Sequence, residues 1–186
     1  MKFSFIQKNK AVVKFLLTFF GSYLLLAGLY QLYLSLSSSS DAYMPDYITS
    51  LVAKQGEELI NAFGYETFSL DYPKNESVRI GIKDRFVVQV IEGCNAVSVI
   101  ILFLSFVLAF FSGWKKTLLF IFAGSVLIYA LNILRIALIT IGLYLYPEYS
   151  SLLHDILFPL FIYGVVFLLW IYWVKQYPKP QKEENE

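Results

Sequence analysis

The feature of this sequence that most constrains its fold is a set of four long apolar runs. They cover about residues 12–34, 94–112, 117–144 and 152–174. A helix that crosses the hydrocarbon core of a bilayer needs about 20 predominantly apolar residues, and each run is close to or above that length. Charged residues make up only 16% of the chain, whereas soluble domains contain about one quarter. The sequence therefore predicts an all-α polytopic membrane protein, in which residues 1–186 form a single membrane domain built on a four-helix transmembrane bundle.

The first run determines how the chain enters the membrane. It is longer than the core of a typical signal peptide, which has about 7–15 apolar residues, so we expect a retained signal anchor. A cleaved signal peptide is the alternative, because Ser35–Ala42 contains small residues suited to cleavage.

The distribution of basic residues predicts the orientation of the bundle, because cytoplasmic loops carry an excess of Lys and Arg. With both termini inside, nine lysines are cytoplasmic and five basic residues are outside. The inner set is Lys2, Lys8, Lys10, Lys14, Lys115, Lys116, Lys175, Lys179 and Lys182, and the outer set is Lys54, Lys74, Arg79, Lys83 and Arg85. We therefore expect both termini in the cytoplasm.

The outer loop, residues 35–93, separates the first and second spans and has structure of its own. Apolar residues recur near helical spacing from Asp46 to Phe63, which predicts an amphipathic helix. The alternating apolar residues of about 78–91 predict a β-hairpin with its turn at Lys83–Asp84. The predicted periplasmic insertion is thus an amphipathic helix plus a β-hairpin.

Composition excludes several classes of function. The net charge is +1, so the chain lacks the basic footprint of a nucleic-acid-binding protein and we expect no nucleic-acid partner. Cys94 is the only cysteine and His154 the only histidine. No intramolecular disulfide can form, and Cys and His cannot complete a four-ligand zinc site. We therefore expect no metal and no cofactor.

Three polar residues are predicted to meet on the outer side of the bundle. An ionisable residue within a span costs about 2.5–3.5 kcal/mol on insertion scales, so Arg135 must face the interior of the bundle. Arg135 lies about 10 residues, or ~15 Å, before the outer end of the third span. Cys94 opens the second span and His154 opens the fourth span from the same side. Each residue alone has an ordinary structural explanation, but their convergence at one depth does not.

This trio is sufficient for thiol catalysis. A thiolate forms more readily beside a cation or at a helix N-terminus, which favours Cys94 as a nucleophile. His154 is then placed to transfer protons, and Arg135 to stabilise an oxyanion or to orient a substrate carbonyl. Supporting roles are expected, on weaker grounds, for Asn132, Asn95, Asp155 and Glu92.

Three short blocks around these residues resemble the signature blocks of the exosortase/archaeosortase family. They are Glu92–Ala96 (EGCNA), Leu131–Ile136 (LNILRI) and Leu153–Asp155 (LHD), with Gly164 ten residues after the histidine. The resemblance covers about residues 86–170, and the short chain looks most like the compact exosortase F type. Ala96 stands where the family block leads us to expect Gly or Ser.

The resemblance implies an integral-membrane cysteine protease or transpeptidase of the bacterial cytoplasmic (inner) membrane, with its active site on the periplasmic side. Such an enzyme cleaves the C-terminal sorting signal of a secreted protein through a thioester and passes the protein to an acceptor. Carried over by position, Cys94 is the nucleophile, Arg135 the essential arginine and His154 the third catalytic residue. The expected partners are membrane lipid and secreted proteins with a C-terminal transmembrane sorting signal.

Two other functions stay open at this point. A noncatalytic membrane transport or assembly subunit would use Arg135 to line a cavity for an anion and would not need the Cys94 thiol. A thiol-dependent membrane acyltransferase would use Cys94 to carry a lipid, and would be labelled by fatty acid instead of by protein. Neither alternative explains why the three blocks occur in this order.

Overall fold

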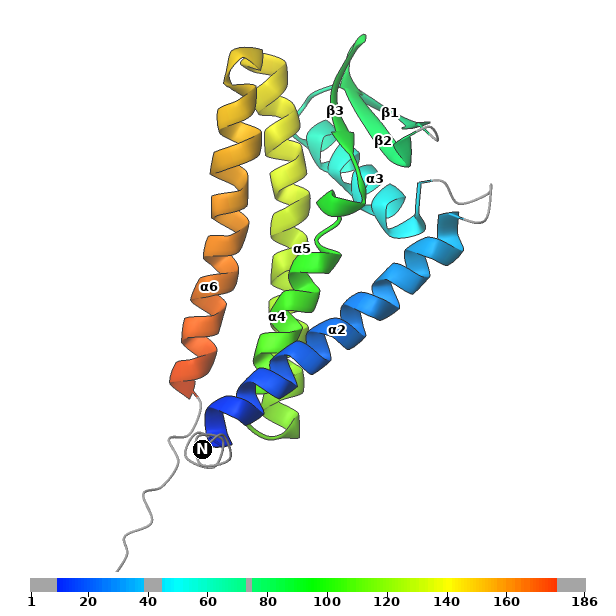
Figure 1. Cartoon of the computed structure of the whole chain (residues 1–186). Coiled ribbons are helices and arrows are strands. Elements are labelled where there is room, and N and C mark those ends of the chain that lie inside the picture. Colours follow the sequence, from blue (N-terminus) through cyan, green and yellow to red (C-terminus); the bar gives the residue numbers. More distant parts are fainter. Residues whose placement is uncertain (1–9, 39–44, 73–74, 177–186) are drawn as a thin grey trace, which may run out of the picture.

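The computed structural model describes residues 10–38, 45–72 and 75–176, apart from the side chains of Ser38, His154, Asp155 and Phe158. Figure 1 shows an upright pair of helices, a shorter helix beside them, a helix that crosses obliquely, and a helix with a sheet at one end. The helices are α2 (Lys10–Ser38), α3 (Tyr47–Ala62), α4 (Val97–Ala109), α5 (Trp114–Leu145) and α6 (Phe158–Gln176), and the strands are β1 (Thr67–Tyr72), β2 (Ser77–Ile82) and β3 (Arg85–Val90). The fold is mostly helical, as expected of a membrane protein.

Three of the described helices are long and apolar enough to cross a membrane: α2, α5 and the Pro159–Gln176 part of α6. The second predicted span is shorter, because α4 has 13 residues, or about 20 Å, against a hydrocarbon core of about 30 Å. The prediction of four spanning helices is therefore wrong. The apolar run begins at Cys94, but a 3-10 turn, η3 (Glu92–Cys94), and the left-handed backbone of Ala96 delay the helix until Val97.

The fourth predicted span does not begin as a regular α-helix. It starts as a π-helical segment, η5 (Leu152–Leu157), and becomes α6 at Phe158. Pro159 has no backbone N–H to donate to the carbonyl four residues earlier, which weakens the first α-helical turn at this point. Figure 1 shows α5 and α6 running antiparallel, with their connection at the same end as α3 and the sheet.

The short helix α4 contacts α2, α5 and α6, and so connects the three longer helices. Its Phe103 is fully buried against Gly124 of α5, where an added Cβ would lie 2.3 Å from the ring. A small residue at such a contact lets two helices approach closely. Near the other end of α4, Trp173 donates from Nε1 to the carbonyl of Phe110 at 3.0 Å. This bond satisfies a carbonyl that the end of the helix leaves free.

The predicted amphipathic helix between Asp46 and Phe63 is confirmed as α3. Asp46 caps it by accepting hydrogen bonds from the N–H groups of Ile48 at 3.0 Å and Thr49 at 3.1 Å. Such a cap satisfies donors that the first turn cannot pair. The apolar face of α3 is buried, with Val52, Ala53, Gly56 and Ile60 on it.

The predicted hairpin is part of a larger sheet. Strands β2 and β3 pair antiparallel around the Lys83–Asp84 turn, as predicted, but β1 pairs with the other side of β2. The result is a three-stranded sheet of order β1-β2-β3 in place of a simple hairpin. Polar and apolar residues alternate over Thr67–Tyr72, a strand signal that the prediction missed.

Helix α3 and the three-stranded sheet form one layer, which we call the outer layer. Helix α5 is long enough both to span a membrane and to support this layer. Its 32 residues measure about 48 Å, well beyond a hydrocarbon core of about 30 Å. Ile136 and Ala137 of α5 belong to one buried cluster with residues of α3 and the sheet. Gly56 of α3 permits the contact, because a Cβ there would lie 2.9 Å from Ile136 Cγ2. Tyr129 adds a hydrogen bond from its hydroxyl to Gln55 Oε1 at 2.6 Å.

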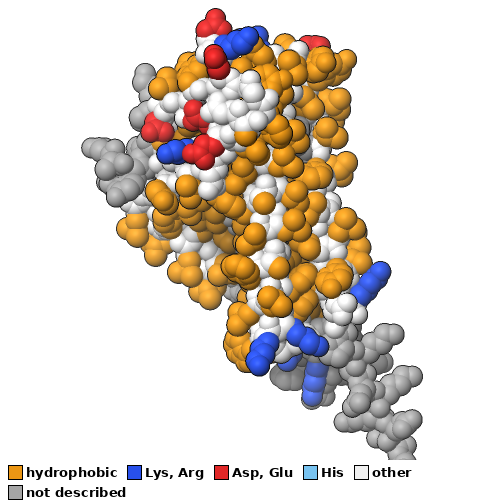
Figure 2. Space-filling model, turned by 180° about the vertical axis from the view of Figure 1, so that it is seen from behind, with side chains coloured by type: hydrophobic (Ala, Val, Ile, Leu, Met, Phe, Trp, Pro, Cys, Tyr) orange, Lys and Arg blue, Asp and Glu red, His pale blue; other side chains and the backbone are white. Residues whose placement is uncertain are grey.

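Basic side chains gather at the end of the molecule opposite to the outer layer. Figure 2 shows a broad hydrophobic surface with Lys and Arg at its lower end and charges of both signs at its upper end. The helix ends at the lower end carry Lys10, Lys14, Lys115, Lys116 and Lys175. Lys2, Lys8, Lys74, Lys179, Lys182 and residues 39–42 of the alternative cleavage region lie outside the described residues. The orientation in the membrane stays a prediction.

Substitution of Gly124 by Ala tests the contact between α4 and α5. The new Cβ has no room beside the buried ring of Phe103, and overpacking of this kind costs about 1–3 kcal/mol. We expect Gly124→Ala to lower the thermal unfolding temperature of the whole chain in detergent. The matched control is Gly28→Ala in α2, where a Cβ meets nothing within 4 Å. Equal unfolding temperatures for the two variants would show that the contact does not matter.

Candidate active site

Cys94 lies between the last strand of the sheet and the first residue of α4. Strand β3 ends at Val90, and the chain passes through Ile91 into the 3-10 turn that ends with Cys94. The next helix begins only after Ala96, whose φ of +67° lies in the left-handed region. Cys94 thus lies in a tight connection between β3 and α4, and it is a partly exposed free thiol.

Asn95 fixes this connection from one side. Asn95 is 1% exposed, and its Oδ1 accepts from the N–H of Val97, the first residue of α4, at 3.0 Å. Its Nδ2 donates to the hydroxyl of Tyr30 at 2.7 Å and to Oγ1 of Thr49 at 3.2 Å. These bonds join α2 and α3 to the residue that follows the thiol.

Asn132 fixes the same connection from the side of α5. It is 2% exposed, and its Nδ2 donates to the backbone carbonyl of Cys94 at 2.7 Å. Its Oδ1 accepts from Nη1 of Arg135 at 3.4 Å. The two side chains can meet because residues three apart lie on one face of a helix. Through these two hydrogen bonds, Asn132 connects the predicted nucleophile to the predicted arginine.

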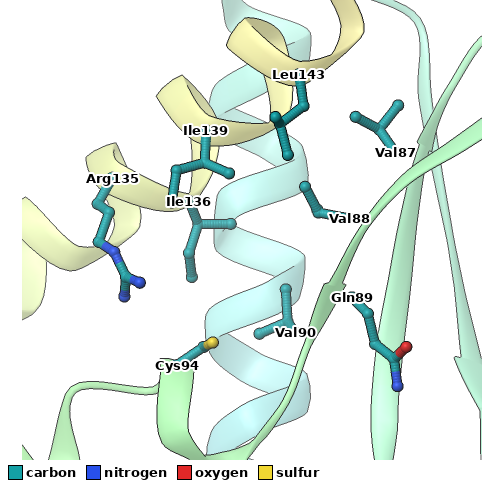
Figure 3. Close-up of a pocket in the computed structure, with 9 residues that line it drawn as sticks. All are labelled: Val87, Val88, Gln89, Val90, Cys94, Arg135, Ile136, Ile139 and Leu143. Atoms are coloured by element: carbon teal, nitrogen blue, oxygen red, sulfur yellow. The ribbon is translucent and has the colours of Figure 1, made fainter. Parts of the chain in front are cut away.

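Cys94 and Arg135 line one cavity of about 250 Å³ between β3 and α5. In Figure 3 the Arg135 side chain extends from α5 toward the level of Cys94, whose Sγ faces the cavity. The Nε atom of Arg135 is buried and has no hydrogen-bond partner among the described residues. The rest of the lining is mostly apolar: Val87, Val88, Gln89, Val90, Ile136, Ile139 and Leu143.

The other predicted site residues are placed differently. Glu92 is exposed in the turn before Cys94, and no described hydrogen bond connects its side chain to the cavity. The backbones of His154 and Asp155 belong to η5, but their side chains lie outside the described residues. The structure therefore brings together Cys94, Arg135, Asn132 and Asn95, whereas the convergence of His154 with them stays a prediction, as do the catalytic roles.

Two residues of this site were missed from the sequence. Tyr30 and Thr49 both contact Asn95, and Thr49 is completely buried. A signal for Tyr30 was present, because Tyr30 and Tyr33 lie three residues apart in the first span and a phenol buried among helices usually finds a partner. No pattern in the sequence marks Thr49, which looks like any other residue in the first turn of α3.

Metal binding finds no support in the described part of the chain, where no three His, Cys, Asp or Glu side chains are close enough to hold an ion. The cavity has one cation and one thiol as its reactive groups. A mostly apolar cavity that is lined by one guanidinium suits a ligand that presents an acceptor such as a carbonyl oxygen.

Comparison with known proteins assigns the chain to a family. The sequence model of the transmembrane exosortases matches residues 11–172, which is most of the chain, so the protein belongs to the exosortase family. The F-type resemblance is compatible with this match. Searches of curated proteins and of solved structures found no match.

The left-handed backbone of Ala96 favours glycine, one of the two residues that the resemblance led us to expect at this position. A left-handed backbone costs about 1–2 kcal/mol for a residue with a Cβ, and glycine avoids most of this cost. We therefore expect Ala96→Gly to raise the free energy of unfolding by about 1 kcal/mol, measured as a higher thermal unfolding temperature. The control is Ala130→Gly on the exposed side of α5, which should destabilise by up to about 1 kcal/mol. A loss of stability for Ala96→Gly would mean that the left-handed turn carries no strain.

Proposed function

We propose that this protein is a membrane transpeptidase that cleaves the C-terminal sorting signal of secreted proteins through a thioester on Cys94. Membership in the exosortase family supports this function. The single observation that carries it is the placement of Cys94 and Arg135, the only cysteine of the chain and a spanning-helix arginine, on one cavity.

The proposed orientation places the cavity at the outer surface of a bacterial inner membrane. If Lys115 and Lys116 mark the inner boundary, Arg135 lies about 28 Å further along α5, close to the outer boundary of a hydrocarbon core of about 30 Å. The outer layer of α3 and the sheet then faces the periplasm. A substrate anchored by a C-terminal transmembrane segment would present the chain just above that segment at this depth.

The proposed reaction has two steps. In the first, the thiol of Cys94 gives up its proton, for which His154 is the candidate base, and the thiolate attacks the scissile carbonyl carbon. The peptide C–N bond breaks, the tail leaves as an amine that takes up the proton, and the secreted protein stays bound as a thioester. In the second, an acceptor nucleophile attacks the thioester, the C–S bond breaks, and the thiol is regenerated.

Arg135 has the chemistry to stabilise the first step. Negative charge develops on the scissile carbonyl oxygen as the thiolate attacks, and a preorganised donor aimed at that oxygen lowers the barrier. The Nε–H of Arg135 has no described partner, whereas one of its terminal nitrogens is held by Asn132. Asn132 thus orients the guanidinium beside the cavity, where its positive charge would stabilise the developing oxyanion.

The catalytic roles predict a graded set of variants. Cys94→Ala should abolish processing, and Cys94→Ser should leave at most traces because a serine hydroxyl is a far weaker nucleophile than a thiolate. Arg135→Lys keeps the charge but loses the planar fork, so it should be strongly impaired. His154→Gln should slow acylation by about 10²–10⁴-fold. Mass spectrometry of secreted proteins, which detects retained C-terminal tails, measures all four against a strain lacking the chain.

Two measurements separate this function from its alternatives. A covalent complex between the chain and a secreted protein, dependent on Cys94 and released by hydroxylamine, is the expected signature. A fatty-acid thioester in its place would indicate the acyltransferase. Wild-type processing by Cys94→Ala would exclude the transpeptidase and leave the transport or assembly subunit. Lys54→Arg, the reverse change on the exposed surface of α3 and away from the cavity, should process normally.

A further inference from the structure

Among the residues that the structure describes, no strand pairs with the edge of the sheet beside the cavity. In the order β1-β2-β3, strand β3 pairs on one side with β2. Within the described residues, no backbone hydrogen bond outside the sheet involves residues 85–90. The outer edge of β3 therefore presents free N–H and C=O groups, which is the arrangement that an added strand recognises.

The catalytic cavity runs along this edge. It touches four consecutive residues of β3, Val87 to Val90, and successive side chains of a strand point to opposite faces. A cavity that touches four in a row therefore follows the edge of the strand instead of one face. A second cavity of about 200 Å³ touches Phe86 and shares three β3 residues with the first, and it extends over the face of the sheet to Arg79 on β2.

Helix α5 forms the wall of the groove opposite β3. Cys94, the proposed nucleophile, lies at one end of the groove. Figure 3 shows β3 and α5 on opposite sides of the cavity, with Cys94 at the end toward which β3 descends. The charged residues that line the two cavities, Arg135 and Arg79, are both cations. The carbonyl oxygens of a bound chain would complement these two cations.

We propose that the open edge of β3 binds the segment of the substrate that precedes the scissile bond as a fourth, parallel strand, which leads the scissile carbonyl to Cys94. This inference rests on the proposed transpeptidase function. The main chain supplies most of the affinity, so the β3 edge accepts many sequences. The apolar lining by Ile139 and Leu143 selects an apolar or small side chain on the face of the added strand that meets α5.

The parallel direction follows from the geometry. Strand β3 begins in the outer layer and runs toward α4, as Figure 1 shows. A substrate whose folded part is outside and whose C-terminal anchor is in the bilayer also runs from the outer layer toward the membrane. The two chains therefore point the same way, so the added strand is parallel to β3 and the sheet becomes mixed.

Filling the groove tests the proposal while leaving the thiol and the arginine in place. Leu143→Trp on α5 should slow conversion of a precursor by at least about tenfold, since the indole occupies space that the added strand needs. The precursor is a protein that keeps its tail in the strain lacking the chain. The matched control is Leu138→Trp, which lies on the exposed face of α5 and should convert at the wild-type rate. Alkylation of Cys94 by N-ethylmaleimide should change less than about twofold in both.

Disulfide mapping tests the strand and its direction independently of Leu143. In a Cys94→Ala chain, Val87→Cys and Gln89→Cys each supply the only thiol, and the precursor carries single cysteines upstream of its tail. Under mild oxidation with copper-phenanthroline, the preferred partner should move two residues toward the C-terminus of the precursor between Val87→Cys and Gln89→Cys. Leu70→Cys on the opposite edge of the sheet should not cross-link.

Each other outcome overturns the inference. Movement toward the N-terminus would mean antiparallel binding, and absence of a cross-link would mean that the edge does not bind substrate. A disulfide-linked dimer of the chain would mean that a second copy covers β3. Normal conversion by Leu143→Trp overturns strand addition but leaves the transpeptidase standing, whereas the lack of any retained tail in the deletion strain removes the transpeptidase itself.

Discussion

The packing of α3 against the outer half of α5 is the contact on which the site depends. One stretch of α5 carries both Asn132 and Arg135, which face the cavity region, and Ile136 and Ala137, which are buried in the core shared with α3 and the sheet. The sheet in turn ends in the turn that carries Cys94. Because the same two turns of helix hold the outer layer and present the arginine, the distance between thiol and guanidinium is set by core packing.

Two buried asparagines make this arrangement specific. An apolar core alone tolerates small shifts between layers, but a buried amide that loses its partner costs about 1–3 kcal/mol. Asn95 bonds to α2, α3 and α4, and Asn132 bonds to the Cys94 carbonyl and to Arg135. Any register in which β3 or α4 slides by one residue breaks several of these bonds at once. The exception is Arg135 Nε, which is left for a group that the described chain does not provide.

The sequence predicted the features whose signals are local. The apolar runs of α2 and α5, the helical spacing of α3 and the alternation around Lys83–Asp84 all predicted these elements. The length of α4 was not predicted correctly, because the apolar run includes Cys94 whereas the left-handed backbone of Ala96 delays the helix until Val97. The strand β1 was missed although it alternates.

Part of the candidate site could be predicted from the sequence for the same reason. Cys94 was identified because it is the only cysteine of the chain. Arg135 was identified because a charged residue within a span is energetically costly. Long-range hydrogen bonds such as that between Tyr30 and Asn95, 65 residues apart, leave no periodic trace in the sequence. They follow from packing between elements that only the folded chain brings together.

The shortness of α4 has a consequence for the lipid around the site. A hydrophobic segment about 10 Å shorter than the hydrocarbon core is accommodated by local thinning of the bilayer. The exposed Glu92 lies just before α4 in the chain, and a carboxylate at this position favours contact with headgroups and water over contact with acyl chains. In the proposed function, a peptide bond next to a transmembrane anchor would then meet the thiol without withdrawal of the anchor from lipid, and such withdrawal would cost about 25 cal/mol for each Å² of apolar surface exposed. A thinner bilayer beside α4 would thus let the anchor of such a substrate stay in lipid during cleavage.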